Sequence, residues 1–331
     1  MNSQTEQQAP SYPWYDDRVE DLHQNLADPE EDYEDQYDTP KKIHGYLCEH
    51  VWKQDEAKRA ASIILHNCLH GIKSNGIFVG PTGSGKSYLW RCLQKIYPNR
   101  IVIADSSGVS KEGWAGSVKW RDLLRSPIFR SENHSILVCD EFDKMCSPKI
   151  TSGGNNASFD VQGEALTLVE GTHVDVKINS VTHSIDTSKI SFVLLGAFSN
   201  KAHDIAEKSS GSRIGFGAAP EPIQPYARPL DIQDLIDFGL MPELAGRISR
   251  IVNLQPMTVE DFYRMTDNSL GFLSHIGEQY KADIRLTPAK RRELAELAAR
   301  TGLGVRGMES QIRHLIDDAI FDDCKRCRFE F

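Results

Sequence analysis

Gly80-Pro81-Thr82-Gly83-Ser84-Gly85-Lys86-Ser87 is the stretch that decides the fold. It matches the phosphate-binding loop pattern G-x-x-x-x-G-K-[ST] at every fixed position. The apolar residues 77–79 before it predict a buried strand. The stretch 88–97 after it predicts a helix, with one apolar face made by Leu89, Cys92, Leu93 and Ile96. The strand–loop–helix context favours a nucleotide site over a glycine-rich turn with a chance lysine.

Each residue type in 80–87 suits a polyphosphate ligand. Glycines let the backbone turn so that its N–H groups point at phosphate oxygens, and the following helix N-terminus adds a positive field. Lys86 is expected to reach the β- and γ-phosphates, and Ser87 to hold Mg²⁺. We therefore predict ATP and Mg²⁺ as cofactors and assign all eight residues to their binding.

A second motif follows downstream. Residues 135–139 form an apolar run that ends in Asp140 and Glu141. We expect this strand to lie beside the phosphate-loop strand in a parallel sheet, so that both carboxylates emerge near the phosphates. Asp140 is then a ligand of a Mg²⁺-bound water, and Glu141 orients and polarises the attacking water. The alternative is that the acidic pair only caps the next segment.

The charge is unevenly distributed along the 331 residues. The formal net charge is −9, yet residues 1–40 hold twelve acids and one base, and the remaining residues hold 35 acids and 37 bases. The body is near neutral and shows no clustered basic face, so we expect no nucleic-acid partner. The polar start and the absence of a long apolar run predict a cytoplasmic protein without a membrane contact.

The pattern predicts three parts. Residues 1–42 are acidic and rich in proline, which predicts a disordered tail that is either a solubilising or a short interaction segment. Residues 43–254 alternate strands and helices, which predicts an α/β domain with a parallel sheet. Residues 255–331 read as a small, mainly helical domain. Within these parts we expect helices at 49–71, 259–273, 288–300 and 308–322, and strands at 101–104, 190–195 and 327–331.

The seven cysteines give little sign of a metal. Cys139 lies in an apolar strand pattern and is expected in the core. Only Cys324 and Cys327 have a metal-ligand spacing, and neither a second pair nor a histidine pair completes a site. We expect reduced thiols and no structural zinc.

The order and spacing of the motifs resemble the ClpX family of AAA+ unfoldases, from about residue 50 to the end. Besides 80–87 and 139–144, the resemblance is carried by 186–190, 234–247 and 301–310. It implies an AAA+ large domain followed by a small lid domain. It also implies a homo-hexameric ring that hydrolyses ATP to unfold protein substrates and delivers them to a ClpP-like peptidase.

The resemblance assigns roles to two arginines. Arg247 corresponds to the arginine finger, which reaches the γ-phosphate held by a neighbouring subunit. Arg306 corresponds to the sensor-2 arginine, which couples the nucleotide to the angle between the two domains. Spacing alone leaves an alternative for each residue: Arg247 is then an ordinary surface arginine after a helix, and Arg306 an ordinary arginine at the start of a helix.

Two further segments take family roles. Gly113, Trp114, Ala115 and Gly116 stand where the family has its aromatic pore loop, with tryptophan in place of tyrosine. Ile214, Gly215 and Phe216 resemble the tripeptide that docks on the peptidase, within a Gly/Ser/Pro-rich stretch.

The sequence also departs from the family pattern. The family's N-terminal zinc-binding module is replaced by the acidic tail, and the segment expected near adenine reads Val51-Trp52-Lys53-Gln54. A sensor-1 residue is not obvious, with Ser199 and Asn200 as candidates. An ATP-regulated remodelling or scaffold protein that works without a peptidase is therefore the alternative function.

Overall fold

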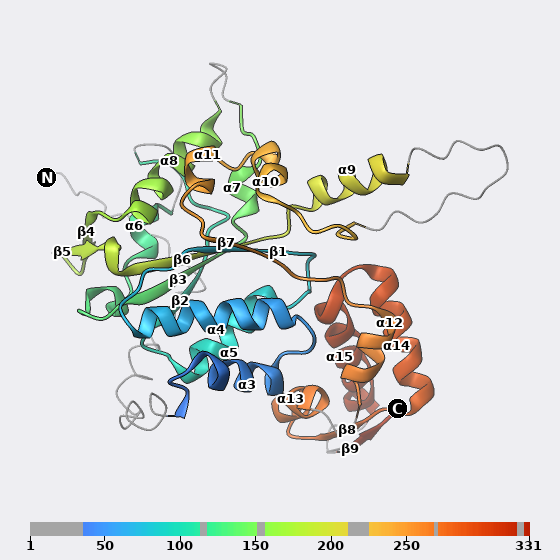
Figure 1. Cartoon of the computed structure of the whole chain (residues 1–331). Coiled ribbons are helices and arrows are strands. Elements are labelled where there is room, and N and C mark those ends of the chain that lie inside the picture. Colours follow the sequence, from blue (N-terminus) through green and yellow to red (C-terminus); the bar gives the residue numbers. More distant parts are fainter. Residues whose placement is uncertain (1–35, 113–117, 151–155, 211–224, 268–270, 323–327) are drawn as a thin grey trace, which may run out of the picture.

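The computed structural model describes residues 36–112, 118–150, 156–210, 225–267, 271–322 and 328–331. Its centre is a five-stranded parallel sheet in the order β2-β3-β6-β1-β7 (Figure 1). The strands are β1 (Gly76–Val79), β2 (Ile101–Asp105), β3 (Ser135–Asp140), β6 (Ile190–Gly196) and β7 (Arg250–Asn253). The prediction of a parallel α/β sheet followed by a mainly helical C-terminal part is confirmed.

The sheet order corrects one expectation. β3, which carries Asp140, does not lie beside the phosphate-loop strand β1, because β6 is inserted between them. Val193 of β6 pairs in register with Gly76 on one side and with Val138 on the other. The carboxyl ends of all five strands still meet at one edge, because parallel strands run in the same direction.

Alternate residues along each strand face two separate cores, which makes three layers. Phe78, Val138 and Val193 pack against α3 (Pro40–His50), α4 (Asp55–Leu69) and α5 (Lys86–Ile96) on one face. Ile77, Cys139 and their neighbours pack against helices on the other face, namely α6 (Trp120–Leu123), α7 (Asp143–Cys146), α8 (Ala157–Glu170), α10 (Ile232–Phe238) and α11 (Pro242–Ala245) (Figure 1). Cys139 is fully buried, as predicted.

The helix predicted at 49–71 is wrong in its first part. Two helices replace it, and the chain breaks between them at Val51–Gln54. Lys53 and Gln54 both have positive φ, which a helix cannot accommodate. The first of the two, α3, begins at Pro40, inside the segment 1–42 predicted as a tail, because Thr39 caps it and the proline occupies its first turn.

A hairpin projects from the large domain at residues 173–186, where no strand was predicted. Its strands β4 (His173–Ile178) and β5 (Val181–Asp186) pair antiparallel, and their buried residues Val176 and Ile185 join the core. Both strands are mostly exposed, so their apolar alternation is weak in the sequence.

The C-terminal part has its own core and lies beside the sheet domain (Figure 1). Its helices are α12 (Val259–Met265), α13 (Gly271–Tyr280), α14 (Pro288–Thr301) and α15 (Gly304–Asp322). The single helix predicted at 259–273 is wrong, because α12 ends at Met265. A two-stranded parallel sheet of β8 (Asp283–Arg285) and β9 (Arg328–Glu330) completes it. The remaining elements are α9 (Ser199–Ser210) and the short helices η1 (Pro127–Arg130) and η2 (Thr187–Lys189).

Among the residues that the structure describes, no helix combines the length and apolar character needed to cross a membrane.

Candidate functional site

The phosphate loop connects β1 directly to α5 at the carboxyl edge of the sheet. β1 ends at Val79 and α5 begins at Lys86. Gly83 and Gly85 have φ of +74° and +95°, which only glycine adopts without strain. The hydroxyl of Ser84 is buried and has no hydrogen-bond partner among the described residues. An open turn with an unpaired buried donor fits a polyphosphate ligand.

The Lys86 ammonium is held within the loop. Its Nζ donates to the carbonyl oxygens of Gly80 and Pro81 at 2.6 and 3.0 Å. Burial lowers the pKa of Lys86 to about 8, against the opposing influence of the nearby Asp143 and Asp140 carboxylates. A buried lysine that is costly to charge would gain a strong partner in a phosphate group.

Ser87 and Asp140 meet across the site. The Ser87 hydroxyl donates to Asp140 Oδ2 at 2.6 Å. Hydroxyl and carboxylate oxygens are ligands that Mg²⁺ prefers, so this pair can hold the ion that accompanies ATP. The structure thus brings together the two residues that the sequence proposed as magnesium ligands, although β3, which carries Asp140, is not a neighbour of β1, which precedes the loop.

Glu141 is exposed and has φ of +58°. Its backbone N–H donates to Asp140 Oδ1 at 3.0 Å, a turn that separates its side chain from the buried end of β3. A non-glycine residue in the left-handed region is strained and often functional. The structure thus leaves the Glu141 side chain exposed directly after Asp140.

The lowered pKa of Lys86 predicts that ATP affinity depends on pH. In the free protein Lys86 loses its proton as pH rises through about 8, whereas bound phosphates hold the proton to higher pH. Binding above pH 8 must therefore take up a proton, and we expect affinity at pH 9.5 to be roughly tenfold or more below that at pH 7. Calorimetric titration with a slowly hydrolysed ATP analogue at both pH values measures this. Lys86→Arg, whose charge does not titrate in this range, should show a much smaller change; an equal change would contradict the assignment.

The C-terminal part reaches the phosphate loop through the start of α15. Val305 N–H donates to the carbonyl of Gly83 at 3.3 Å. A Cβ placed on Gly83 would lie 2.5 Å from the Leu303 carbonyl oxygen, so the two backbones are in direct contact. Arg306 is close enough to Lys86 to lower its pKa. The structure therefore places Arg306 at the nucleotide site, next to residues more than 200 positions earlier in the chain.

Two glycines test this contact as a matched pair. Gly302 and Gly304 have similar positive φ, +66° and +61°, but a Cβ on Gly302 meets nothing, whereas one on Gly304 would lie 2.7 Å from the Gly83 carbonyl oxygen. We expect Gly302→Ala to cost about 1 kcal/mol from backbone strain, and Gly304→Ala to cost about 1–3 kcal/mol more from the clash. Denaturant unfolding measures both. Equal losses would show that the contact is not needed for stability.

A second connection between the two parts was not identified from sequence. Gln54, in left-handed conformation, donates to the carbonyls of Gln255 and Ser84 and accepts from the Gln255 N–H. Beside it, Lys53 binds Asp261 at 2.8 Å. Lys53 and Gln54 thus tie the segment Val51–Gln54 to the phosphate loop and to the start of the C-terminal part, and its expected position near adenine stays a prediction.

Arg247 lies at the edge of the sheet opposite the phosphate loop. It precedes β7, whose first residue Arg250 pairs in register with Gly76 at the start of β1. The Arg247 carbonyl accepts from Asn75, the residue before β1. The four residues of β1 alone span about 13 Å, so Arg247 and the phosphate loop lie at opposite ends of the strand.

The Arg247 side chain is paired at the surface. Its Nε and Nη2 both donate to Glu170 Oε1, at 3.0 and 2.6 Å, and both side chains are about half exposed. Glu170, the last residue of α8, was not singled out from sequence, because a lone glutamate at a helix end carries no pattern. This pair orients the guanidinium without burying it.

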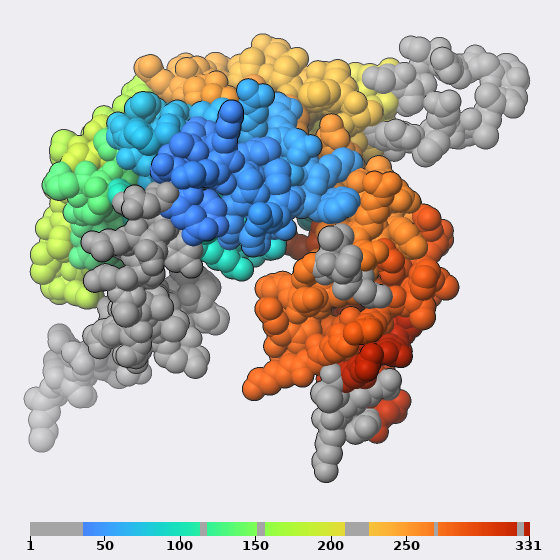
Figure 2. Space-filling view, turned by 60° about the horizontal axis from the view of Figure 1, so that its bottom comes forward, coloured from blue at the N-terminus to red at the C-terminus, as the bar shows by residue number. Residues whose placement is uncertain are grey.

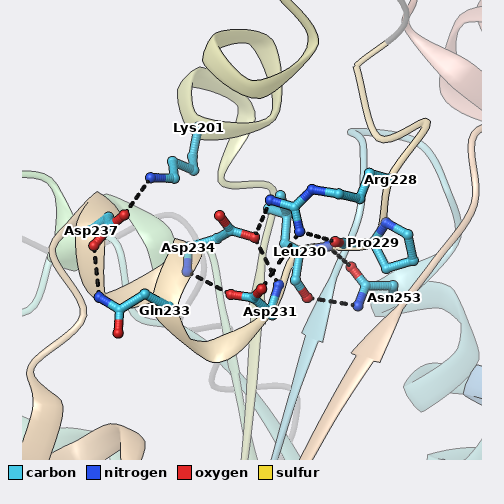
Figure 3. Close-up of polar contacts among 9 residues, drawn as sticks. All are labelled: Lys201, Arg228, Pro229, Leu230, Asp231, Gln233, Asp234, Asp237 and Asn253. Atoms are coloured by element: carbon cyan, nitrogen blue, oxygen red, sulfur yellow. Dashed lines mark hydrogen bonds and ion pairs between the residues drawn. The ribbon is translucent and has the colours of Figure 1, made fainter. Parts of the chain in front are cut away.

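A polar network fixes the chain that leads to Arg247 (Figure 3). Asp231 and Asp234 cap α10 reciprocally, and Arg228 donates to Asp234 at 2.7 Å. The Asn253 side chain binds both backbone groups of Leu230, which ties the segment to the end of β7. On the other side, Lys201 of α9 pairs with Asp237.

The sensor-1 candidates lie at the start of α9. The Ser199 hydroxyl is 3.2 Å from the Tyr226 hydroxyl, which in turn donates to Ala197. Within the part of the chain that the structure describes, no hydrogen bond or ion pair joins Ser199 or Asn200 to the phosphate loop, and their role stays a prediction. The residues of the predicted pore loop (113–116), the docking tripeptide (214–216) and the pair Cys324 and Cys327 lie outside the described residues.

The comparison with known proteins agrees with this geometry. A family model described as "AAA domain (Cdc48 subfamily)" matches residues 72–251, more than half of the chain. The chain belongs to the AAA family. The matched segment runs from just before β1 to within β7 and so includes the phosphate loop, Asp140, Glu141 and Arg247.

Curated relatives of this AAA protein cover most of its length. It is 29% identical over 324 residues to the ATP-dependent Clp protease ATP-binding subunit ClpX of Treponema denticola, covering 86% of this chain and 77% of that protein. It is 28% identical over 332 residues to the ATP-dependent Clp protease ATP-binding subunit ClpX 2 of Wolinella succinogenes, covering 89% and 81%. The protein is therefore an ATPase with the AAA+ fold that resembles ClpX.

Proposed function

We propose that this AAA ATPase works as a ring in which each nucleotide lies between two protomers. The observation that carries the proposal is the position of Arg247, at the edge of the sheet opposite its own phosphate loop. An exposed guanidinium, held in place by Glu170, has the chemistry to stabilise charge on a transferring phosphate. It can do so only for the nucleotide of another copy of the chain.

Within one protomer the remaining roles follow from the site geometry. Lys86 binds the β- and γ-phosphates, while Ser87 and Asp140 hold Mg²⁺. Glu141 positions water for attack on the γ-phosphate. Arg306, on the helix that touches the loop, senses the nucleotide and moves the C-terminal part against the sheet domain. Because α15 contacts the loop backbone directly, a change at the phosphates is transmitted as a rigid-body rotation.

The work done by the ring is inferred from the relatives, which are named as subunits of a Clp protease. We infer that the protein unfolds protein substrates and passes them to a ClpP-like peptidase. Trp114, flanked by small residues in the sequence, has the large amphipathic side chain that suits a grip on polypeptides of any sequence. Ile214 and Phe216 suit a hydrophobic cleft on the peptidase.

Assembly is tested by light scattering of the Glu141→Gln protein with a slowly hydrolysed ATP analogue. We expect a mass near six protomers with nucleotide and a smaller mass without it. A monomer under all conditions would remove the shared nucleotide site and the ring with it.

Delivery to a peptidase is tested by co-sedimentation with ClpP. Wild-type protein is expected to sediment with ClpP in the presence of ATP, and Phe216→Ala to bind at least about tenfold more weakly, as for a central hydrophobic anchor. If the ring assembles and wild type and Phe216→Ala bind ClpP equally, the tripeptide is not the anchor. If the ring assembles but does not bind ClpP, the result favours the alternative function, an ATPase that remodels proteins without a peptidase.

A further inference from the structure

Three side chains of metal-binding type gather where α3 meets α4. One ligand atom each of His44, Cys48 and Asp55 lies within 4.8 Å of the other two. His44 is half-buried, and Cys48 and Asp55 are exposed, so an ion can reach them from solvent. The helices α3 and α4, in blue, form the near face of the molecule in Figure 2. None of the three residues has a role in the nucleotide site.

The local fold explains why these residues meet. His44 and Cys48 are four residues apart on α3 and therefore share a face. The chain then turns through Val51–Gln54, where two residues have positive φ, and α4 packs back against α3. Asp55, the first residue of α4, is thereby returned to the face that carries His44 and Cys48.

The separations bring these side chains within reach of one ion. Cys48 Sγ lies 3.6 Å from His44 Nδ1 and 3.9 Å from Nε2, so the sulfur lies beside the imidazole ring. With ordinary Zn–S and Zn–N bond lengths, the edge of a tetrahedral site between a thiolate and an imidazole nitrogen is about 3.6 Å. The distance to Nδ1 suits this edge, and a rotation of the imidazole ring is needed to aim Nδ1 at the ion. The carboxylate has to approach by roughly 1 Å to complete the set, and an exposed aspartate can do this by side-chain rotation.

One neighbour opposes a cation. Lys58 Nζ is 2.8 Å from Asp55 Oδ1, and the Lys58 side chain is almost fully buried and cannot move away. The second carboxylate oxygen, Oδ2, is left for the ion. The lysine charge weakens the site and favours an ion that bonds strongly to sulfur and nitrogen over Mg²⁺ or Ca²⁺, which depend on oxygen ligands.

We propose that His44, Cys48 and Asp55 bind a divalent transition-metal ion, best matched by Zn²⁺, with water as the fourth ligand. The ion joins the end of α3 to the start of α4 and braces the segment Val51–Gln54. That segment carries Gln54 to the phosphate loop. A zinc ion at this place would revise the sequence-based expectation of no structural zinc. It does not depend on ring assembly or on ATP hydrolysis.

The test measures Zn²⁺ binding by equilibrium dialysis on the full chain carrying Cys324→Ser and Cys327→Ser, which removes the other thiol pair. We expect one ion per chain. His44→Ala and Cys48→Ser should each weaken binding at least about tenfold, since even a supporting contact of a metal ligand is worth that much. His50→Ala is the matched control, because His50 lies on the same helix outside the cluster and binds the Tyr46 carbonyl. It should bind Zn²⁺ as the parent does.

A spectroscopic readout distinguishes ligation from loss of structure. Co²⁺ bound to the parent should show the intense near-ultraviolet absorption of a thiolate ligand, and Cys48→Ser should lack it while keeping the same circular dichroism. Unchanged Zn²⁺ affinity in Cys48→Ser would overturn the proposal, and the close Cys48–His44 contact would then be only a thiol hydrogen bond. Zinc binding that disappears from the parent when Cys324 and Cys327 are replaced would overturn it as well.

Discussion

Arg247→Ala is expected to lower the ATP hydrolysis rate by about 10³-fold or more, the range seen when an arginine finger is removed. The cause is loss of positive charge at the transferring phosphate. Affinity for ATP should change little, because Arg247 lies at the sheet edge opposite its own phosphate loop. Steady-state hydrolysis and calorimetric binding of an ATP analogue separate the two quantities.

Arg250→Ala is the matched control. Arg250 is an exposed arginine three residues later, at the start of β7, and its removal should leave hydrolysis near the wild-type rate. A mixing experiment then tests the shared site: a Lys86→Ala protomer keeps Arg247 and can complete the site of an Arg247→Ala protomer. Mixed proteins should hydrolyse ATP faster than either variant alone. A mixture no faster than its parts would argue against sharing.

The ion pair with Glu170 separates the role of Arg247 from a stabilising one. Both side chains are about half exposed, so breaking the pair by Glu170→Gln should cost less than about 1 kcal/mol of folding stability. If Arg247 served mainly to hold α8 against the start of β7, Arg247→Ala and Glu170→Gln would behave alike. We expect Arg247→Ala to hydrolyse ATP far more slowly than Glu170→Gln, and the two variants to have similar folding stability.

Glu141→Gln is expected to slow hydrolysis by about 10²- to 10⁴-fold, because an amide cannot accept the proton or polarise the attacking water. The loop that binds ATP is untouched, so affinity should remain within about threefold of wild type, and the variant should accumulate with ATP bound. A filter-binding assay for retained ATP, together with hydrolysis rates, measures this.

Asp105→Asn is the control for Glu141. Asp105 ends β2 in register with Asp140, at the same edge of the sheet but one strand further from the loop, and it binds Ser107 N–H. We expect nearly normal hydrolysis from it. Normal turnover by Glu141→Gln would reject the assignment of the water-positioning residue, and an equal loss in both variants would show only a general effect of charge.

The nucleotide site was largely predictable from local sequence. The loop 80–87 imposes its geometry through its own glycines, and apolar strands that end in acidic residues place carboxylates at the edge where parallel strands finish. These signals are local, because each depends on a few consecutive residues. The prediction that Asp140 lies near Ser87 therefore held, even though the predicted adjacency of β1 and β3 was wrong.

The error in the helix predicted at 49–71 has a tertiary cause. A continuous apolar periodicity over 49–71 predicted one helix, yet Lys53 and Gln54 adopt left-handed backbone that contacts with Asp261, Ser84 and Gln255 stabilise. The contacts with Asp261 and Gln255 join residues about 200 positions apart, and the contact with Ser84 joins residues 30 positions apart. A short window of sequence around Lys53 and Gln54 therefore contains none of their partners. Tertiary structure overrode the local preference for helix.

By itself the sequence determined the class of the fold and the chemistry of its central loop, because glycine geometry and strand hydrophobicity act over a few residues. Only the tertiary structure decided that β6 separates β1 from β3, that α15 touches Gly83, and that Arg247 lies at the sheet edge opposite its own phosphate loop and pairs with Glu170. These are relations between distant segments. They arise from strand order and from the packing of separate cores, which no local pattern encodes.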